Sequence, residues 1–364
     1  MASLELVNLW KRYGATVAVR GIDLRIADGE FVALLGPSGC GKTSTMRMVA
    51  GLEDVSDGEI RFDGKSVNVV HPRDRRVAMA FENYALYATL NVYENVAFPL
   101  RARSWEDTRV DARVKEIAST MRLTELLERR THELSAGQQQ AVGLARALVR
   151  QPSVLLLDEP ISHLDTRQRS EMRAYLKHLH QSLRTTMLYV THDQEEAMAM
   201  SDRVAVMNEG KLVQVGTPAQ IFDAPADVFV AGFIGEPPMN LLEVTADPGA
   251  GVLRHAGQRI PLPIAYRAAL QAGASQELVL GLRPFHVAIG ELREDTLGAE
   301  IFVNEPLGDA SVLTLLLDGA RMMAVAPSGF PGRPGDRVGL TLDPEHLLLF
   351  DRAGGKAIER TRPS

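Results

Sequence analysis

Cysteine is almost absent from this sequence, since the 364 residues include one, Cys40. A single cysteine excludes an internal disulfide and fits a reducing cytosol. Its position inside a glycine-rich loop favours the role of a small side chain that fits over that of a redox sensor.

Long apolar runs are missing as well. Stretches such as 154–157 have the length of strands and fall far short of the roughly 18 residues that span a membrane. Glu5 and Lys11 interrupt the first residues, so we expect no secretory signal. With a net charge of −6, the chain lacks a positive field that would attract nucleic acid or an anionic membrane. These absences predict an ordinary globular protein.

What the chain does contain is a glycine-rich loop at residues 36–43, Gly-Pro-Ser-Gly-Cys-Gly-Lys-Thr. Its glycines let the backbone turn tightly and bring N–H donors against phosphate oxygens. Lys42 would reach the β- and γ-phosphates, and the Thr43 hydroxyl would hold Mg²⁺. The run 31–35 predicts a buried strand before the loop, and 43–49 predict a helix whose N-terminus faces the anion. This order predicts a nucleoside triphosphate site formed by Gly36, Pro37, Ser38, Gly39, Cys40, Gly41, Lys42, Thr43 and Ser44.

A pair of carboxylates follows a second apolar run, at 154–157. The run predicts a strand beside the strand of the phosphate loop, so that Asp158 could hold Mg²⁺ through water. Glu159 has the position of a general base that polarises the attacking water. Such a pair alone could simply cap the next element, but its distance after a phosphate loop favours the functional interpretation.

The organisation of the chain changes along its length. Alternating apolar and polar residues in 3–35 predict a twisted antiparallel sheet, and 88–150, for example 110–127, predict an inserted helical subdomain. Strands expected at 154–157 and 187–190, each followed by helical sequence, favour a parallel α/β core. The division that we predict is therefore a domain over 1–235 and a second domain over 236–364.

Short strands separated by glycine and proline dominate 236–364 and predict a small all-β barrel or sandwich. With 12 basic and 16 acidic residues, this region is a poor nucleic-acid binder. The expected strands are 241–245, 252–255, 278–282, 299–303, 312–317 and 338–342.

The segment Leu134-Ser-Ala-Gly-Gln-Gln139 carries the most specific signal. Ser135 and Gln138 form a capping-box pattern, and the apolar face that follows, Val142, Ala145 and Val149, predicts a helix. Alone, this is a well-capped helix. Together with the phosphate loop, the Asp-Glu pair and Ser162-His-Leu-Asp165, the order resembles the ATP-binding cassette family over residues 1 to about 235.

The resemblance implies that two cassettes close head to tail around ATP. Ser135, Gly137 and Gln138 would then act in trans on the γ-phosphate that the other subunit holds. Asp165 would lie in a loop that spans the dimer, and His192, after the strand 187–190, would be the switch histidine that contacts the γ-phosphate. Tyr13 matches the aromatic residue that stacks on adenine.

Within the family, the chain is most similar to cassette subunits of bacterial importers for maltose, related sugars and glycerol 3-phosphate. The similarity rests on Tyr84-Ala-Leu-Tyr87, on Val92-Tyr-Glu-Asn-Val-Ala-Phe-Pro99 and on Gly281-Leu-Arg-Pro284. It implies that a regulatory domain with an oligonucleotide/oligosaccharide-binding-like (OB-like) barrel follows the cassette, and that the segment after residue 82 receives helices of the membrane subunits.

The resemblance also implies the partners of an ATPase that drives the import of a carbohydrate, a polyol such as glycerol, or glycerol phosphate. These are ATP and Mg²⁺, a second cassette subunit, two integral-membrane permease subunits and, indirectly, an extracellular or periplasmic solute-binding protein. Nucleic acid is not among them. The chain would then be a peripheral subunit at the cytoplasmic face of the plasma membrane.

Several residues depart from the family pattern. Glu82 stands where a glutamine usually touches Mg²⁺ and the attacking water. A full charge about 5 Å from a phosphate oxygen would cost roughly 3 kcal/mol at an effective dielectric of 20. Coordination of Mg²⁺ or protonation could offset this cost, so Glu82 joins Thr43 and Asp158 as a candidate Mg²⁺ ligand. Lesser departures from the family pattern are Ala136 for a usual glycine, Ala141 for a usual basic residue, His163 for a usual asparagine and Phe285 for a usual glutamate.

These departures leave three interpretations open. The chain could form an ordinary homodimer, or it could be a weakly active cassette paired with a different one. A soluble cassette ATPase of DNA repair or translation is the third. The sequence disfavours this last class, because it has one copy of each motif and no sustained heptads.

Overall fold

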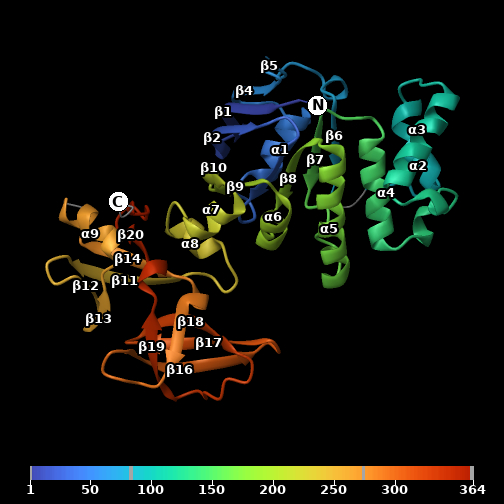
Figure 1. Ribbon diagram of the computed structural model, residues 1–364. Helices are drawn as coiled ribbons and strands as arrows, with labels where there is room; N and C mark the ends of the chain where they lie inside the picture. Colours follow the sequence, from blue (N-terminus) through green and yellow to red (C-terminus); the bar gives the residue numbers. More distant parts are fainter. Residues whose placement is uncertain (1, 82–84, 273–274, 361–364) are drawn as a thin grey trace. The chain divides into compact units, whose positions relative to one another are not determined.

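The computed structural model describes residues 2–81, 85–272 and 275–360. Its contacts divide the chain into two compact units, Met1–Pro218 and Ala219–Ser364 (Figure 1). The predicted boundary at residue 235 lies farther along the chain. Helix α8 (Val228–Phe233), which lies between the two positions, packs on strands of the second unit. Each unit is described by itself.

A six-stranded sheet in the order β10-β9-β3-β8-β7-β6 is the central layer of the first unit. Its neighbours pair in parallel except for β10 and β9. The predicted strands 31–35, 154–157 and 187–190 are confirmed. The bounds are β3 (Phe31–Leu35), β6 (Val77–Ala80), β7 (Val154–Asp158), β8 (Thr186–Thr191), β9 (Arg203–Asn208) and β10 (Lys211–Gly216).

One prediction about this sheet was wrong. We expected the strand that ends in Asp158 to lie beside the strand of the phosphate loop, but β8 lies between β7 and β3. The crossover helix α5 (Thr166–Leu183) returns the chain to the edge of β7, and β8 then pairs with β3 on its other side. The carboxylates are therefore two strands away from the loop strand.

Both faces of the sheet are covered, which explains the uninterrupted apolar runs of its strands. Along β7, Val154 and Leu156 face one hydrophobic core, and Leu155 and Leu157 face another. One core contains α1 (Lys42–Ala50) and an antiparallel sheet, and the other contains helices.

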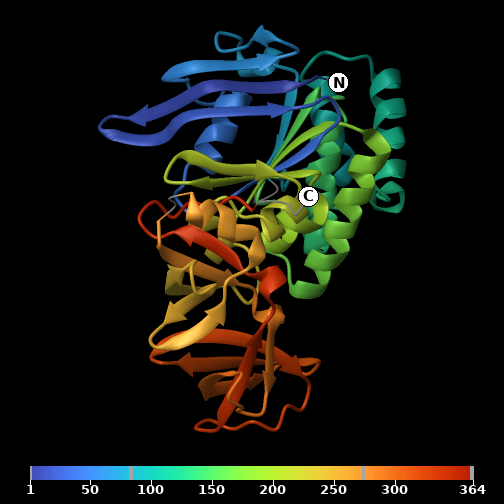
Figure 2. The same cartoon turned by 60° about the vertical axis from the view of Figure 1, so that its left-hand side comes forward.

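The antiparallel sheet has the order β2-β1-β4-β5, which confirms the sheet predicted for the first residues. Figure 2 shows β1 and β2, in dark blue, as a long twisted hairpin. The bounds are β1 (Leu4–Tyr13), β2 (Thr16–Ile26), β4 (Asp57–Phe62) and β5 (Lys65–Ser66).

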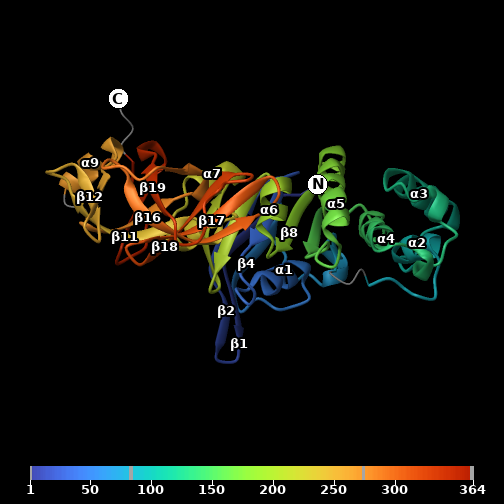
Figure 3. The same cartoon turned by 90° about the horizontal axis from the view of Figure 1, so that it is seen from below.

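Helices fill the segment that was predicted to be a helical subdomain. Figure 3 shows α2 (Val92–Arg101), α3 (Asp107–Thr120) and α4 (Ala136–Leu148) grouped together beyond α5. The helical pattern of 110–127 does not form one helix. It stops at Thr120 because Arg122 adopts a left-handed conformation with φ 55°, and a short 3₁₀ turn follows at Thr124–Leu126. In the described ranges, no helix is long and apolar enough to cross a membrane.

The second unit consists of two five-stranded antiparallel sheets around one shared core. Their orders are β13-β12-β11-β14-β20 and β15-β19-β16-β17-β18. Burial alternates residue by residue along β11 and β17, as it must when one face is solvated. The predicted all-β architecture is confirmed. The bounds are β11 (Asn240–Asp247), β12 (Val252–His255), β13 (Gln258–Pro261), β14 (Glu277–Leu282), β15 (Val287–Gly290), β16 (Leu297–Pro306), β17 (Ala310–Leu317), β18 (Ala320–Pro327), β19 (Arg337–Leu342) and β20 (Leu348–Asp351), with helices α7 (Pro218–Asp223) and α9 (Ile264–Gln271).

Candidate functional site

The candidate site lies at the carboxyl ends of three parallel strands. The sheet pairs Leu35 of β3 with Thr191 of β8, and Asp158 of β7 with Val190 of β8. The phosphate loop, the carboxylates and His192 therefore leave the sheet at the same edge. This edge is where parallel α/β sheets bind their ligands.

The phosphate loop joins β3 to α1, and close packing demands glycine at two positions. A Cβ at Gly36 would lie 2.2 Å from the carbonyl oxygen of Met207. Gly41 has φ 104°, and a Cβ there would lie 2.4 Å from the carbonyl oxygen of Ala18. Both contacts are too short for any side chain, so the backbone comes as close to its neighbours as the motif requires.

Lys42 and Cys40 are buried against the loop itself. Lys42 is 5% exposed, and its ammonium donates to the carbonyl oxygens of Gly36 at 2.8 Å and Pro37 at 3.0 Å. These bonds point the lysine into the loop, where a phosphate oxygen could replace a carbonyl as acceptor. Burial raises the pKa of the Cys40 thiol, which keeps it protonated and agrees with its interpretation as a small packing side chain.

Tyr13 lies beside the first turn of α1. Its hydroxyl is 3.2 Å from the Ser44 Oγ and donates to the Glu53 carboxylate, while the Lys11 ammonium lies 4.8 Å from its ring centroid. At 45% exposure, the ring remains accessible. The structure thus brings Tyr13 to the end of the phosphate loop and adds Glu53 and Lys11 as residues that hold it. Its stacking on adenine stays a prediction.

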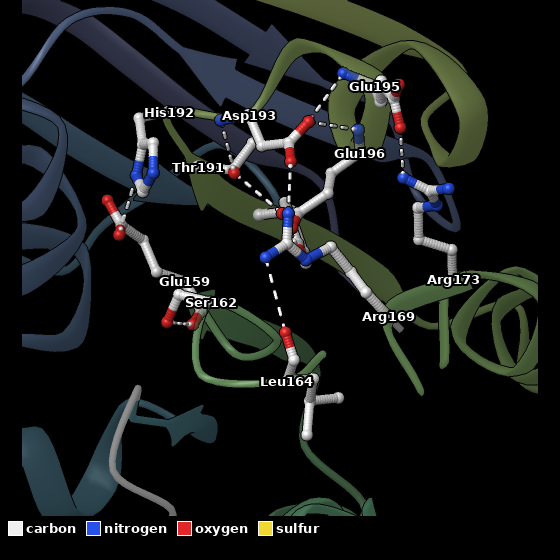
Figure 4. A network of polar contacts seen from close by, with 11 residues as sticks. Glu159, Ser162, Leu164, Arg169, Arg173, Thr191, His192, Asp193, Glu195 and Glu196 are labelled. Atoms are coloured by element: carbon white, nitrogen blue, oxygen red, sulfur yellow. Dashed lines mark hydrogen bonds and ion pairs between the residues drawn. The ribbon is translucent and has the colours of Figure 1, made fainter. Parts of the chain in front are cut away.

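Glu159 and His192 are in direct contact. The Glu159 carboxylate lies 2.9 Å from the His192 Nδ1, and the Glu159 amide donates to the Val190 carbonyl at 2.9 Å. Figure 4 shows the two side chains facing each other across the ends of β7 and β8. Since a carboxylate accepts, the Nδ1 carries the proton. The His192 side chain is 55% exposed and the Glu159 side chain 24%, so both can meet a ligand from solvent.

The expected dimer-spanning loop runs from this pair into α5. The Ser162 hydroxyl donates to the Glu159 carbonyl at 3.0 Å, which folds the loop back on the carboxylate. Asp165 then caps α5, because its carboxylate accepts from the Gln168 amide at 2.8 Å.

The residues expected to act in trans meet on one open cavity of about 940 Å³. Ser135 caps α4 through the predicted capping box, with the Ser135 amide 2.9 Å from the Gln138 Oε1 and the Gln138 amide 3.3 Å from the Ser135 Oγ. Gly137 and Asp165 line the same cavity. Of the described residues around it, none belongs to the phosphate loop of the same chain, so this face is separate from the loop.

The departures from the family pattern occupy different environments. Ala136 is the first residue of α4, and Ala141 is buried in the helical core. Phe285 is exposed in the second unit, and His163 precedes Leu164 in the loop before α5. Glu82 lies outside the described residues.

Sequence reasoning missed Arg169, which connects two loops of the site. Its Nη2 donates to the Leu164 carbonyl at 3.4 Å, and its Nη1 lies 3.3 Å from an Asp193 carboxylate oxygen. Asp193 follows His192 and caps α6 (Gln194–Met200), accepting from the Glu195 amide at 2.8 Å. The available signal was a spacing of four residues from the capping Asp165, which places Arg169 one turn into α5.

A buried carboxylate holds the end of β8 by hydrogen bonds to two of its side chains. Glu196, on α6, accepts from the hydroxyls of Tyr189 and Thr191, both at 2.7 Å. Burial raises the pKa of the Glu196 carboxyl, and the two hydroxyl bonds oppose that rise. The Thr191 hydroxyl in turn accepts from the Asp193 amide at 3.0 Å, so the segment around His192 is fixed by consecutive bonds.

A glycine-rich loop after a buried parallel strand, with two carboxylates and a histidine at the same sheet edge, defines a P-loop nucleotide hydrolase. The family model for ABC transporters matches residues 19–162, that for the MalK OB fold domain matches 235–287, and that for the TOBE domain matches 280–350. With these matches and the full-length relatives below, the chain belongs to the ABC transporter family, and it is an ATP-binding, ATP-hydrolysing member.

Relatives match along their whole length. The trehalose/maltose import ATP-binding protein of Thermococcus litoralis is 44% identical, and the match covers 98% of this chain and 100% of that protein. An sn-glycerol-3-phosphate import ATP-binding protein of Cupriavidus metallidurans is also 44% identical, over 99% of each chain. The sulfoquinovosyl glycerol transport ATP-binding protein of Agrobacterium fabrum is 40% identical over 98% of this chain and 100% of its own.

Solved structures agree with the cassette fold. A cassette of a Clostridium perfringens ABC transporter complex is 30% identical with a TM-score of 0.56, over 60% of this chain and 89% of that one. A cassette solved as a dimer in a post-hydrolysis state, bound to ADP and Pi, is 28% identical with a TM-score of 0.52, over 59% of this chain and 98% of its own.

Proposed function

We propose that this chain is the ATP-hydrolysing subunit of an importer for a carbohydrate, a polyol such as glycerol, or a glycerol phosphate. The observation that carries the proposal is full-length similarity at 44% identity to subunits named for trehalose/maltose and sn-glycerol-3-phosphate import. Similarity continues through 236–364, the proposed regulatory domain, and so extends beyond the cassette that ABC proteins of many functions share.

The nucleotide would bind at the loop Gly36–Ser44 with its adenine on Tyr13. The buried Lys42, the tight glycines and the adjacent N-terminus of α1 suit an anion of high charge. Thr43 and Asp158 offer the oxygen donors that Mg²⁺ prefers, and Glu82 is proposed as a third ligand. Bound Mg²⁺ would neutralise charge that develops on the phosphate oxygens.

Hydrolysis would use the contact between Glu159 and His192. Glu159 accepts a proton from the attacking water, the water oxygen bonds to the γ-phosphorus, and the bond from phosphorus to ADP breaks. The Nδ1–H of His192 keeps the carboxylate in place. The side chain is 55% exposed, and when Nε2 also carries a proton it would donate to a γ-phosphate oxygen. The products are ADP and phosphate.

Two cassettes would close around two nucleotides. Support comes from the cavity that gathers Ser135, Gly137, Gln138 and Asp165 on a face separate from the phosphate loop of the same chain. Such residues need a second chain to meet a phosphate. Closure would move two integral-membrane partners at the cytoplasmic face of the plasma membrane, with an external solute-binding protein that delivers the solute.

A second candidate is an unequal pair in which this chain joins a different, more active cassette. Ala141 favours it, because a buried alanine replaces the usual basic residue in the helix that carries Ser135. The same experiment separates the two candidates.

The test is purification of the tagged chain from its native membrane, followed by reconstitution into vesicles. We expect two membrane proteins to copurify and ATP to drive uptake of one solute from a panel of trehalose, maltose, glycerol, glycerol 3-phosphate and sulfoquinovosyl glycerol. One cassette species at twofold stoichiometry supports the homodimer, and two species support the unequal pair. Absence of membrane partners, or ATP-independent uptake, contradicts the proposal.

A further inference from the structure

Arg169 occupies a position that reaches two loops of the site at once. It lies in the first turns of α5, where its amide donates to the Asp165 carbonyl at 2.8 Å. Its guanidinium then extends from α5 to the Leu164 carbonyl on one side and to the Asp193 carboxylate on the other. Figure 4 shows Arg169 between these two groups. One side chain thus touches the residue before Asp165 and the residue after His192.

The Asp193 end of this connection is rigid. One carboxylate oxygen of Asp193 accepts from the amides of Glu195 and Glu196, and the other meets Arg169. The Asp193 amide is bound to Thr191, which is bound to the buried Glu196. A displacement of Asp193 must therefore also displace His192, which is the hydrogen-bond partner of Glu159.

The bonds of Arg169 itself are long and incomplete. Its two contacts, at 3.3 and 3.4 Å, lie at the upper limit for hydrogen bonds. Its Nε is buried and, among the described residues, has no partner. A guanidinium held this way can shorten its bonds when the surrounding loops move, whereas a fully bonded one cannot.

We propose that Arg169 is a positioning residue that couples Asp165, at the predicted dimer interface, to the Glu159–His192 pair of the same chain. The proposal rests on the proposed function, because Asp165 matters to hydrolysis only where a second cassette meets it. When the partner cassette moves the loop at Leu164, Arg169 transmits that movement to Asp193 and so to the histidine that holds the general base.

Arg173 provides a matched control. It lies one turn farther along α5 and pairs with Glu195 on α6 at 2.8 Å, so it connects the same two helices by the same kind of ion pair. Within the part of the chain that the structure describes, its guanidinium donates to Glu195 and not to Leu164 or Asp193. If the arginines only hold the two helices together, substitution of either one should reduce ATP hydrolysis. If Arg169 couples the two loops, only its own substitution should do so.

The test compares Arg169→Gln, Arg169→Lys and Arg173→Gln in the purified full-length chain, with phosphate release measured against ATP concentration. For Arg169→Gln we expect kcat to fall about 10- to 100-fold and the Hill coefficient to approach 1. We expect the Kd for ATP, measured in a Glu159→Gln background, to stay within about twofold. Arg169→Lys, which can reach one acceptor at a time, should recover part of the rate. Arg173→Gln should match the wild type in all three measurements.

A double variant makes the test specific for the Asp193 contact. If both residues act through one connection, Arg169→Gln with Asp193→Asn should be no slower than the slower single variant. The proposal is contradicted if the losses of kcat in the two single variants add in the double variant. It is also contradicted if Arg169→Gln has the kcat and Hill coefficient of the wild type, or the same values as Arg173→Gln. A wild type whose Hill coefficient is 1 also overturns it. Failure of solute uptake in vesicles, with cooperative ATP hydrolysis retained, contradicts the proposed importer and leaves the outcome for Arg169 intact.

Discussion

Two arginines bonded to backbone carbonyls, one in each unit, are held in very different ways. Arg283 of the second unit is 4% exposed, stacks 4.1 Å from the Phe222 ring and donates to the carbonyls of Phe222, Ala231 and Ile234. Burial lowers its pKa to about 10. The Arg169 side chain of the first unit is about one-third exposed and contacts one carbonyl and one carboxylate, both at long distance. In both arginines the Nε is buried and has no partner among the described residues, so the difference lies in the number and length of the bonds that the terminal nitrogens make.

We interpret this difference as one of role: Arg283 stabilises a fixed arrangement of helices and strand, whereas the contacts of Arg169 would change during the catalytic cycle. Arg283 follows β14, and its guanidinium joins this strand end to α7 and α8 by donating to three backbone carbonyls there. Arg169 bridges loops that the catalytic cycle would rearrange. Substitutions in the site of the first unit should therefore reduce activity while stability is retained, and buried polar substitutions in the second unit should do the reverse.

Glu159→Gln gives the largest expected effect on the activity side. Glutamine cannot accept the proton of the attacking water, so kcat should fall by about 10²- to 10⁴-fold. The unfolding midpoint in urea should stay close to that of the wild type, because the side chain is partly exposed. Phosphate release and urea titration measure the two quantities. Glu195→Gln, on the exposed surface of α6, is the control, and comparable rates for both variants would show that Glu159 is not the base.

Arg283→Met gives the largest expected effect on stability. It leaves three carbonyls near α7 and α8 without their donor, and each buried unsatisfied group costs about 1–3 kcal/mol. We expect a loss of about 3 kcal/mol in the free energy of unfolding, confined to 219–364 in hydrogen exchange, with ATP hydrolysis by the first unit retained.

The exposed Arg254 is the matched control for that change. It pairs with Asp247 at the surface at 3.1 Å, and such pairs contribute well under about 1 kcal/mol. If Arg254→Met destabilises the unit as much as Arg283→Met does, the hydrogen bonds from Arg283 to the three carbonyls have no special role in its stability.

How far the sequence predicts this molecule depends on how local each feature is. The phosphate loop, the capping box at Ser135 and the carboxylates after 154–157 are short patterns whose chemistry lies within a few residues. The strands before the loop and the carboxylates, and the capping box itself, form as predicted. The position of β8 between β3 and β7 was missed, because strand order is decided by a crossover and not by the strand itself.

The two arginines were missed for the same reason. Arg169 meets Asp193 across 24 positions, and Arg283 meets its carbonyls across 49 to 61 positions. No periodicity links residues at such separations. Gly281-Leu-Arg-Pro284 was recognised as a family pattern, but the role of its arginine emerges only where α7 and α8 end against it.

Two buried amide side chains, Gln140 of the first unit and Asn240 of the second, compare the two units with a smaller expected effect on stability. The Gln140 side chain is 2% exposed in the core of the helical part, and within the residues described neither its Nε2 nor its Oε1 has a partner. Asn240 of the second unit, similarly buried, bonds the backbone of Met323 at both ends, at 2.8 and 2.6 Å.

Gln140→Met should therefore raise the free energy of unfolding by about 1 kcal/mol, because it removes two unpaired polar atoms at similar volume. Asn240→Leu should lower it by about 2 kcal/mol. Thermal and urea unfolding of the full chain measure both changes. A destabilised Gln140→Met protein would indicate that the amide has an acceptor or donor that appears when the cassettes pair.

The smallest expected effect concerns a stacked pair of histidines in the second unit, His286 and His346, whose ring centroids are 3.6 Å apart. Burial and then the neighbouring His346 lower the pKa of His286, and Asp343, which accepts from His346 at 2.8 Å, opposes that fall together with Asp223. Since the folded state binds the proton less well than the unfolded state, stability should decrease as the pH falls below about 6.5.

The ring signals of His286 in a pH titration by NMR measure this directly. His346→Phe keeps the stack and removes the charge, so it should raise the pKa of His286 only in part, because burial persists. It should also reduce, but not abolish, the loss of stability between pH 7 and 5.5. An unchanged pKa in this variant would assign the shift to burial and to the Arg283 guanidinium, and would leave the two rings electrostatically independent.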